Sequence, residues 1–138
     1  MLSEGEVLNM FYDFAGDPAQ LPSLTLAYIG DAVYELYIRE FFLNKGEVKA
    51  RQLHKQVIKR VNAGSQAKFY EKIENMLTEL ELSVAKRGRN AKSGQIPKNA
   101  LVTDYRKSTG FEALIGYLFL KKDDQRIQEL LTYLLDEQ

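Results

Sequence analysis

Apolar residues recur every three or four positions along most of the chain, which is the spacing of one face of an α-helix. Strand signals are weak by comparison. The longest apolar segment runs over 24–43 and is apolar nearly all round, a pattern typical of a buried central helix or of one shared with a partner subunit. We expect Ser23 to cap this helix and Asn44-Lys45-Gly46 to end it.

Shorter periodic segments predict the other helices. A capping box at Ser3 and Glu6, followed by Phe11 and Phe14 at helical spacing, indicates an N-terminal helix. After the long helix, a third helix is expected at about 48–62, and a fourth begins with a cap at Ser65. A second capping box at Thr78 and Glu81 opens a fifth helix that reaches Arg87. A sixth helix is expected over 105–121 with a cap at Thr103 or Asp104, and the last begins with a cap at Asp123 or Asp124.

Glycine and proline residues interrupt the helical pattern between the fifth and sixth expected helices. Gly88 is expected to stop the fifth helix, and 89–102, with Gly94 and Pro97, reads as a loop. No repeat, low-complexity tract or linker divides the chain. The sequence therefore predicts a single all-α domain over 1–138, a bundle of about seven helices.

Composition removes several classes of protein. The chain of 138 residues has no Cys and one His, which excludes a disulfide framework or thiolate metal site and argues strongly against a His-rich zinc site. No secretory signal opens the sequence. The long apolar segment carries Asp31, Glu35, Arg39 and Glu40, which argues against a membrane span. An ordinary soluble domain is expected.

The charges cancel overall but are segregated along the chain. Residues 1–44 carry seven acids against one arginine, whereas 45–72 carry eight Lys or Arg against two acids. Residues 86–107 carry seven Lys or Arg against one acid. Two basic blocks in a neutral protein suggest a positive face toward a polyanion such as nucleic acid, although two solvated helix faces would give the same pattern.

The candidate chemistry is a pair of acids in apolar surroundings. Asp31 follows Gly30 inside the most apolar helix, and Glu112 precedes Gly116 by one turn in another. Two glycine-bearing helices could pack closely and bring Asp31 and Glu112 together, giving an oxygen-ligand site suited to Mg²⁺ or Mn²⁺. The alternative is a structural acid bonded to Arg, Tyr or backbone donors.

Weaker candidates have simpler explanations. Glu35, one turn after Asp31, could be another acid of the site, but a salt bridge with Arg39 is at least as good an interpretation. His54 lies among basic residues and is expected on the surface.

The two acidic motifs resemble those of a known enzyme family. Tyr28-Ile29-Gly30-Asp31-Ala32-Val33 is similar to the signature helix of the ribonuclease III family, and Phe111-Glu112-Ala113-Leu114-Ile115-Gly116 to its second catalytic helix. The segments 86–94, 97–99 and 108–112 resemble the Mini-III branch, bacterial ribonucleases that lack a double-stranded-RNA-binding domain. The resemblance covers about 20–136 and implies the ribonuclease III catalytic-domain fold.

The sequence departs from the wider family at two acidic positions. Ribonuclease III generally has an acid four residues before the signature Asp and another three residues before the second Glu, where this chain has Ala27 and Thr109. The Mini-III branch looks similar in this respect. The departures leave open whether water, Thr109 or Glu35 fills those positions and how many metal ions bind.

The resemblance implies a Mg²⁺-dependent endonuclease for double-stranded RNA, with Mn²⁺ as a possible substitute, in which Asp31 and Glu112 bind the metal and are catalytic. It implies a homodimer in the cytoplasm of a bacterium that trims the precursor 23S rRNA stem, with or without a ribosomal-protein helper. RNA is expected to contact the basic loop. Lys55 and Lys59 are weaker candidates, because a solvated helix face explains these two lysines better. The expected RNA-binding residues of that loop are Lys86, Arg87, Arg89, Lys92 and Lys98.

Two other functions remain open at the level of sequence. The chain could be a non-catalytic RNA-binding ribosome-assembly factor that has lost the acids at positions 27 and 109. It could also be an all-α interaction module in which the buried acid is structural.

Overall fold

The computed structural model describes residues 11–92 and 101–136, and in these ranges it contains six α-helices, two turns of 3₁₀ helix and no strand. The elements are η1 (Pro18–Gln20), α2 (Ser23–Asn44), α3 (Ala50–Val61), α4 (Ala63–Ile73), η2 (Glu74–Met76), α5 (Glu79–Asn90), α6 (Val102–Leu120) and α7 (Asp124–Asp136). The all-α prediction is confirmed, with six α-helices in the described part of the chain against the seven expected.

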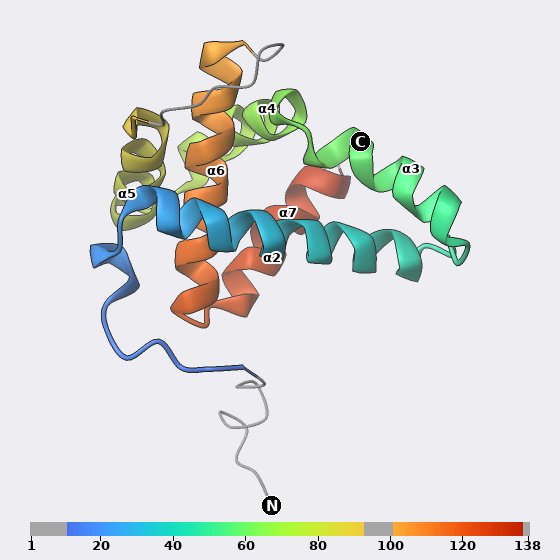
Figure 1. The fold of residues 1–138 in the computed structure, drawn as a ribbon, viewed down its shortest axis with the longest axis horizontal. Coiled ribbons are helices and arrows are strands. Elements are labelled where there is room, and N and C mark those ends of the chain that lie inside the picture. The colour runs from blue at the N-terminus through green and yellow to red at the C-terminus, as the bar shows by residue number, and fades with distance from the viewer. Residues whose placement is uncertain (1–10, 93–100, 137–138) are drawn as a thin grey trace, which may run out of the picture.

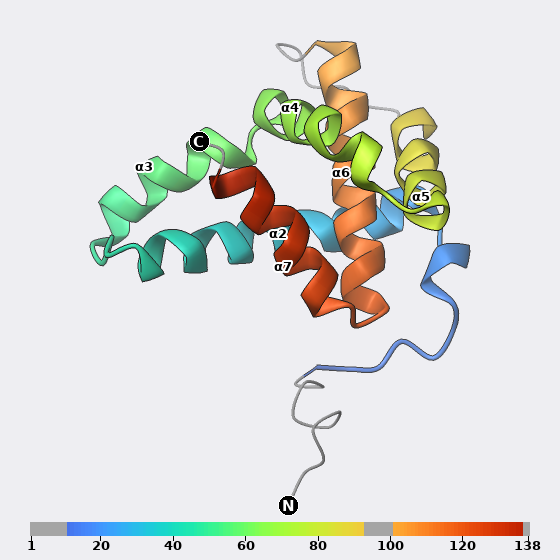
Figure 2. The same cartoon turned by 180° about the vertical axis from the view of Figure 1, so that it is seen from behind.

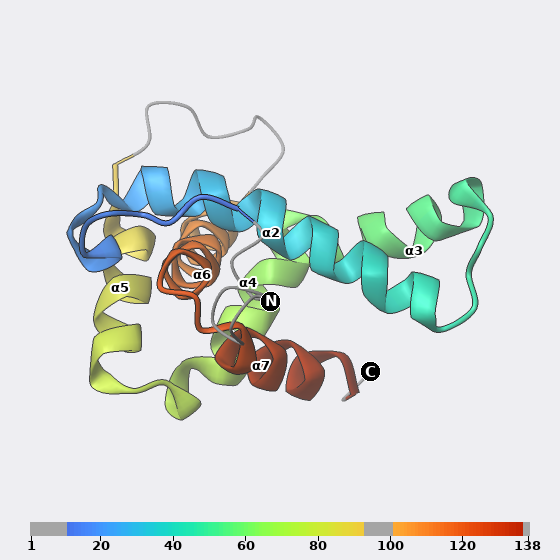
Figure 3. The same ribbon diagram turned by 90° about the horizontal axis from the view of Figure 1, so that it is seen from below.

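Helix α6 is the centre of the molecule. In Figure 3 it is seen nearly end-on, with α2, α5, α4 and α7 around it, and in Figure 1 α2 crosses in front of it. All its residues from 108 to 118 are buried except Glu112, which is partly buried. Helices α4 and α7 cover the opposite side, as Figure 2 shows from behind. The central helix is thus α6, and the first of the two interpretations of segment 24–43 is wrong.

Helix α2 is only half covered. It buries Leu26, Tyr34 and Ile38 against the core, but Tyr28 is 81% exposed and Leu36 is 55% exposed. Its all-round apolar pattern therefore reflects one face that packs inside and another that lies at the surface.

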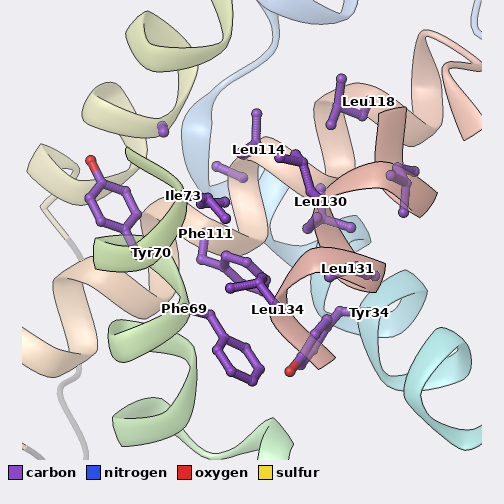
Figure 4. Packing of buried hydrophobic residues seen from close by; sticks show 14 of the residues in the cluster. Tyr34, Phe69, Tyr70, Ile73, Phe111, Leu114, Leu118, Leu130, Leu131 and Leu134 are labelled. Carbon is purple, nitrogen blue, oxygen red and sulfur yellow. The ribbon is translucent and has the colours of Figure 1, made fainter. Parts of the chain in front are cut away.

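The core joins α6 to the helices on both sides (Figure 4). The Tyr34 and Phe111 rings meet edge-on with their centroids 5.1 Å apart, so an aromatic pair links α2 and α6. The largest fully buried side chains are Tyr34, Tyr70, Phe111, Leu26, Ile38, Ile73, Leu114, Ile115, Leu118, Leu130, Leu131 and Leu134.

Gly88 does not end a helix, contrary to the sequence prediction. Helix α5 continues to Asn90, and Gly88 is buried inside it. A Cβ added at Gly88 would lie 2.9 Å from the Cα of Gly110 and 2.8 Å from the Cβ of Ala113. The glycine is present because α5 and α6 cross closely here, so tertiary packing and not chain termination explains it.

The N-terminal helix expected from Phe11 and Phe14 is absent from the described residues, since 11–17 has no helix. Its capping box at Ser3 and Glu6 lies outside them. Both phenylalanines are exposed, so no buried face is available to stabilise a short helix there.

Most helix starts differ by a few residues from those expected. Pro22 occupies the N-cap position of α2, and Leu101 that of α6. Asn62 caps α4 by accepting a hydrogen bond from the Ser65 N–H. The sequence contains several capping residues within one turn, and which of them caps is decided by packing.

The capping box at Thr78 and Glu81 forms as predicted, and Glu81 also binds an arginine of α7. Glu81 is buried, and both of its carboxylate oxygens accept hydrogen bonds of 2.9 Å from the Arg126 guanidinium. Arg126 also donates to the Met76 carbonyl at 2.8 Å. The start of α5 is thereby fastened to α7 by a hydrogen-bonded pair of opposite charges.

Among the residues described, none of the helices has the length and apolar character that crossing a lipid bilayer requires.

Candidate active site

The candidate site lies where the backbones of α2 and α6 touch. A Cβ added at Gly30 would overlap the carbonyl oxygen of Glu112, and one added at Gly116 would overlap the carbonyl oxygen of Leu26. The two glycines therefore form reciprocal halves of one helix crossing. Because Asp31 adjoins Gly30 and the Gly30 Cα lies against the Glu112 backbone, the crossing brings the two acids side by side.

The carboxyl groups of Asp31 and Glu112 are hydrogen-bonded to each other. The predicted convergence is confirmed, although it is Glu112 that is partly buried, while Asp31 is exposed. Burial, the hydrogen bond to Asp31 and the charge of Asp31 together raise the pKa of Glu112 to about 8. Without a cation Glu112 therefore keeps its proton at neutral pH.

A buried amide lies on the inner side of the site, and the sequence pattern did not predict its role. Gln66 of α4 is 1% exposed and hydrogen-bonds to Glu112, which lowers the pKa of that carboxyl against the larger raising effects. The signal was present, since Gln66 stands one turn before Phe69 and two before Ile73 on the inward stripe of α4. A polar residue on such a stripe needs partners.

The two positions that lack the family's acids contribute little. Ala27 is buried one turn before Asp31 and has no ligating atom. Thr109 is buried, and its hydroxyl donates to the Tyr105 carbonyl at 3.0 Å within its own helix. Glu35 pairs with Arg39 at 3.4 Å, so the salt bridge weighed from the sequence is present.

The donor set suits a hard divalent cation that keeps most of its water. Within 11–92 and 101–136, no group of three or more His, Asp or Glu side chains gathers closely enough to enclose a metal. Asp31 and Glu112 nevertheless offer carboxylate oxygens, and a cation between them would relieve the repulsion that raises the Glu112 pKa. Mg²⁺ is commonly bound through one or two carboxylates with water and phosphate oxygens completing its shell.

The basic residues expected in a loop lie mostly on α5. Lys86, Arg87 and Arg89 belong to its last turns because the helix runs to Asn90, and Lys92 follows it. Lys98 lies outside the described residues. The expectation that 89–102 is entirely loop is therefore wrong for its first two residues and for Val102, which begins α6.

These side chains are not equally available. Lys86 and Lys92 are exposed, whereas Arg89 is half-buried and its guanidinium lies 3.6 Å from the Glu74 carboxylate. Arg87 is exposed and donates a 2.6 Å hydrogen bond to the Ala19 carbonyl. His54 is exposed on α3, as expected.

A surface hollow of about 800 Å³ is lined by basic residues of α5 and by the start of α2, the helix that carries Asp31. Its walls include Lys86 and Arg87 of α5 and Leu24 at the start of α2. Leu24 and Asp31 are seven residues apart, which places them on the same side of α2 about 10 Å apart along its axis. The hollow lined by Lys86 and Arg87 and the acidic pair at Asp31 thus lie along the same side of α2.

The chain is similar to known proteins over most of its length. The ribonuclease III domain family matches residues 24–123. The chain is 45% identical to the Mini-ribonuclease 3 of Clostridium tetani over 87% of this chain and 80% of that protein. It is 48% identical to the Mini-ribonuclease 3 of Brevibacillus brevis over 83% and 86% of the two chains. A crystal structure of a protein from Fusobacterium nucleatum superposes with a TM-score of 0.79 at 32% identity, covering 89% of this chain and 98% of that one.

Proposed function

Because the chain belongs to the ribonuclease III family and resembles its Mini-ribonuclease 3 members, we propose that it cuts double-stranded RNA with Asp31 and Glu112 as catalytic, metal-binding carboxylates. The protein is an endoribonuclease. The observation that carries the assignment of the site is the crossing at Gly30 and Gly116, which holds the two acids in hydrogen-bond contact.

The reaction is hydrolysis of a phosphodiester. Water adds to phosphorus, the bond to the 3′ oxygen breaks, and that oxygen takes the proton, leaving a 5′-phosphate and a 3′-hydroxyl. Asp31 and Glu112 would hold Mg²⁺, or Mn²⁺ in its place. Such an ion would act as a Lewis acid, which activates water and neutralises the charge that develops on the phosphate. The chain itself keeps the two carboxylates at a fixed separation, because their helices touch through backbone atoms.

RNA is proposed to lie along the side of α2 that joins the positive hollow to Asp31. Lys86, Arg87, Arg89, Lys92 and Lys98 are the proposed phosphate contacts, and Lys86 and Arg87 line the hollow. A-form duplex is read mainly through its shape, phosphates and 2′-hydroxyls, for which Lys and Arg are suited. Lys55 and Lys59 are exposed on α3, as a solvated helix face requires.

The double variant Lys86→Gln/Arg87→Gln is expected to weaken duplex binding about tenfold and to lower the slope of log affinity against log salt by about two, because two phosphate contacts are lost. Lys45→Gln is the control, because Lys45 follows the other end of α2, about 30 Å along the axis from Leu24. Binding is measured by fluorescence anisotropy across a salt series on a catalytically inactive background. An unchanged slope would remove these residues from the interface.

The protein is further proposed to act as a homodimer through the exposed side of α2. Tyr28 and Leu36 are uncovered there beside Asp31 and Glu35, and a solvent-exposed apolar stripe of this kind is typical of an interface. Two-fold symmetry would present two acidic pairs to the two strands of a duplex.

Light scattering at micromolar concentration is expected to give twice the chain mass of 15.8 kDa. Leu36→Glu should shift the mass toward the monomer, because it places a charge in the apolar stripe. Leu80→Glu on α5, at a leucine that is 50% exposed, should leave the mass unchanged. A monomeric wild-type protein would defeat the proposal.

The proposed substrate is the stem that joins the two ends of precursor 23S rRNA, which the resemblance to the Mini-III branch implies. Such a substrate would place the protein in the cytoplasm of a bacterium, and the curated relatives named above are bacterial. A ribosomal protein bound to the precursor is a proposed helper, because a small catalytic dimer offers few phosphate contacts of its own.

The proposed function is tested by incubating a labelled 23S precursor stem, and a single strand of the same sequence, with the protein in Mg²⁺ and in EDTA. Cleavage of the duplex alone, and only with metal, supports it. Duplex binding without any cleavage would instead favour the ribosome-assembly factor, and would make Ala27 and Thr109 the decisive departures. Absence of both binding and cleavage would indicate a structural role for the two acids.

A further inference from the structure

Gln66 of α4 interacts with groups from two neighbouring helices, α3 and α6. Its side-chain oxygen accepts a hydrogen bond from the Ser108 hydroxyl of α6. Its side-chain nitrogen lies 3.3 Å from the Val61 carbonyl oxygen at the end of α3. The Glu112 carboxyl belongs to the residue one turn beyond Ser108 on the same side of α6, and the Gln66 amide lowers its pKa. The side chain is 1% exposed, so water does not compete for these bonds.

The contacts fix which way the amide points. A backbone carbonyl only accepts, so the atom facing Val61 is the NH₂ group, and the oxygen must face Ser108. The same NH₂ group has a second hydrogen for Glu112, which favours the ionised form of that carboxyl. A flip of the amide would set the side-chain oxygen against the Val61 carbonyl, and two acceptors would then face each other.

We propose that Gln66 is a positioning residue that orients the Glu112 carboxylate toward Asp31 for cation binding, with Ser108 and Val61 fixing the amide. The inference rests on the proposed function, because it requires a cation between the two acids. Gln66 does not itself contact the cation. It holds Glu112 from behind, while Asp31 approaches from α2 on the other side of the helix crossing.

The arrangement matches the general requirement of weak metal sites. In the described part of the chain the site has two carboxylate ligands, so cation binding depends on the rotamer of each. An amide that donates to the ligand from a rigid, buried position removes the freedom of Glu112 before the cation arrives.

The test is direct binding of Mn²⁺ alone, followed by electron paramagnetic resonance, in the wild-type protein and four variants. Gln66→Met keeps the length and apolar shape of the side chain but removes the donor, and it is expected to raise the dissociation constant about 10- to 100-fold. Ser108→Ala frees the amide oxygen but keeps the donor, so a rise of about threefold is expected. Ile73→Val, at a fully buried residue two turns further along α4, is the control for packing and is expected to leave the constant unchanged. Asp31→Asn is expected to abolish the binding.

The outcomes separate the inference from the function on which it rests. If the wild type binds Mn²⁺ through Asp31 and both Gln66→Met and Ser108→Ala match Ile73→Val, Gln66 is structural and the inference is overturned while the proposed function stands. If wild-type binding is absent or survives Asp31→Asn, the proposed function and the inference both fall. Should Gln66→Met not fold, Ser108→Ala decides, because it alters no side chain of α4. A large rise of the Mn²⁺ dissociation constant in Gln66→Met and a smaller rise in Ser108→Ala, without loss of helicity, support the inference.

Discussion

Glu112→Gln is expected to abolish RNA cleavage and, in the absence of metal, to make the protein more stable than the wild type at alkaline pH. Asp31→Asn should be equally inactive. Loss of one of two carboxylate ligands removes several kcal/mol of transition-state stabilisation, and about 4 kcal/mol corresponds to a thousandfold loss of rate. Both variants should stay folded, since each replaces a carboxylate by an amide of nearly the same shape.

The effect on stability follows from the pKa of Glu112, which rises from 4.5 to about 8 on folding. Between these values the unfolded chain has released the proton and the folded protein still holds it, so the free energy of unfolding falls as the pH rises. The loss is complete above about pH 8, where the folded protein carries two adjacent carboxylates. The amide that replaces the Glu112 carboxyl has no charge at any pH, so the variant should escape a loss of the order of a few kcal/mol.

Thermal unfolding in EDTA between pH 5 and pH 9 measures this difference. The melting temperatures of Glu112→Gln and wild type should diverge as the pH rises, with the variant above. Mg²⁺ should then raise the melting temperature of the wild type and not that of the variant, because only the wild type binds it in the folded state. Parallel curves in EDTA would contradict the raised pKa, and cleavage by either variant would contradict the assignment of the acids.

Gly30→Ala is expected to cost about 3 kcal/mol or more and to abolish cleavage as well. The new methyl group would overlap the Glu112 carbonyl oxygen, and a backbone atom in the centre of the protein cannot move aside cheaply. The gain of about 1 kcal/mol in helix propensity is too small to offset the overlap. Forcing α2 away from α6 would also separate Asp31 from Glu112.

Urea unfolding of Gly30→Ala beside Gly64→Ala tests this expectation. A Cβ at Gly64 would lie 3.4 Å from the Asn62 side-chain oxygen and 3.9 Å from that of Asp104, which are ordinary contacts. Gly64→Ala should therefore be neutral or slightly stabilising. Equal midpoints for Gly30→Ala and wild type would mean that the helix crossing is looser than the structure indicates.

The sequence predicted the convergence of the two acids because Asp31 follows Gly30 and Glu112 precedes Gly116 by one turn, each within a long apolar helix. Gly30 and Gly116 have little reason to be in helix interiors unless something approaches closely, and the approach is that of the other helix. The capping box at Thr78 was equally readable, since it depends on residues within one turn.

What the sequence did not predict depends on contacts between distant segments. Gly88 has the local signature of a helix end, and only the position of α6 shows that it is a packing residue. Arg87 and Arg89 read as free cations, yet one donates to Ala19 and the other pairs with Glu74. Gln66 could be noticed only as a polar residue on an apolar stripe, and its partners Ser108 and Glu112 belong to a distant part of the sequence.

The crossing of α2 and α6 ties the proposed catalytic pair to the integrity of the whole molecule. Each of the two acids sits on a helix whose backbone is part of the core, and neither is carried by a loop. Local opening of an edge of the protein therefore leaves the acids together, and their separation requires the central helix to leave its place. Heat inactivation and global unfolding are then a single event. Changes to the proposed RNA contacts on α5 can accumulate without disturbing the acidic pair, so specificity and catalysis are free to evolve separately on this small scaffold.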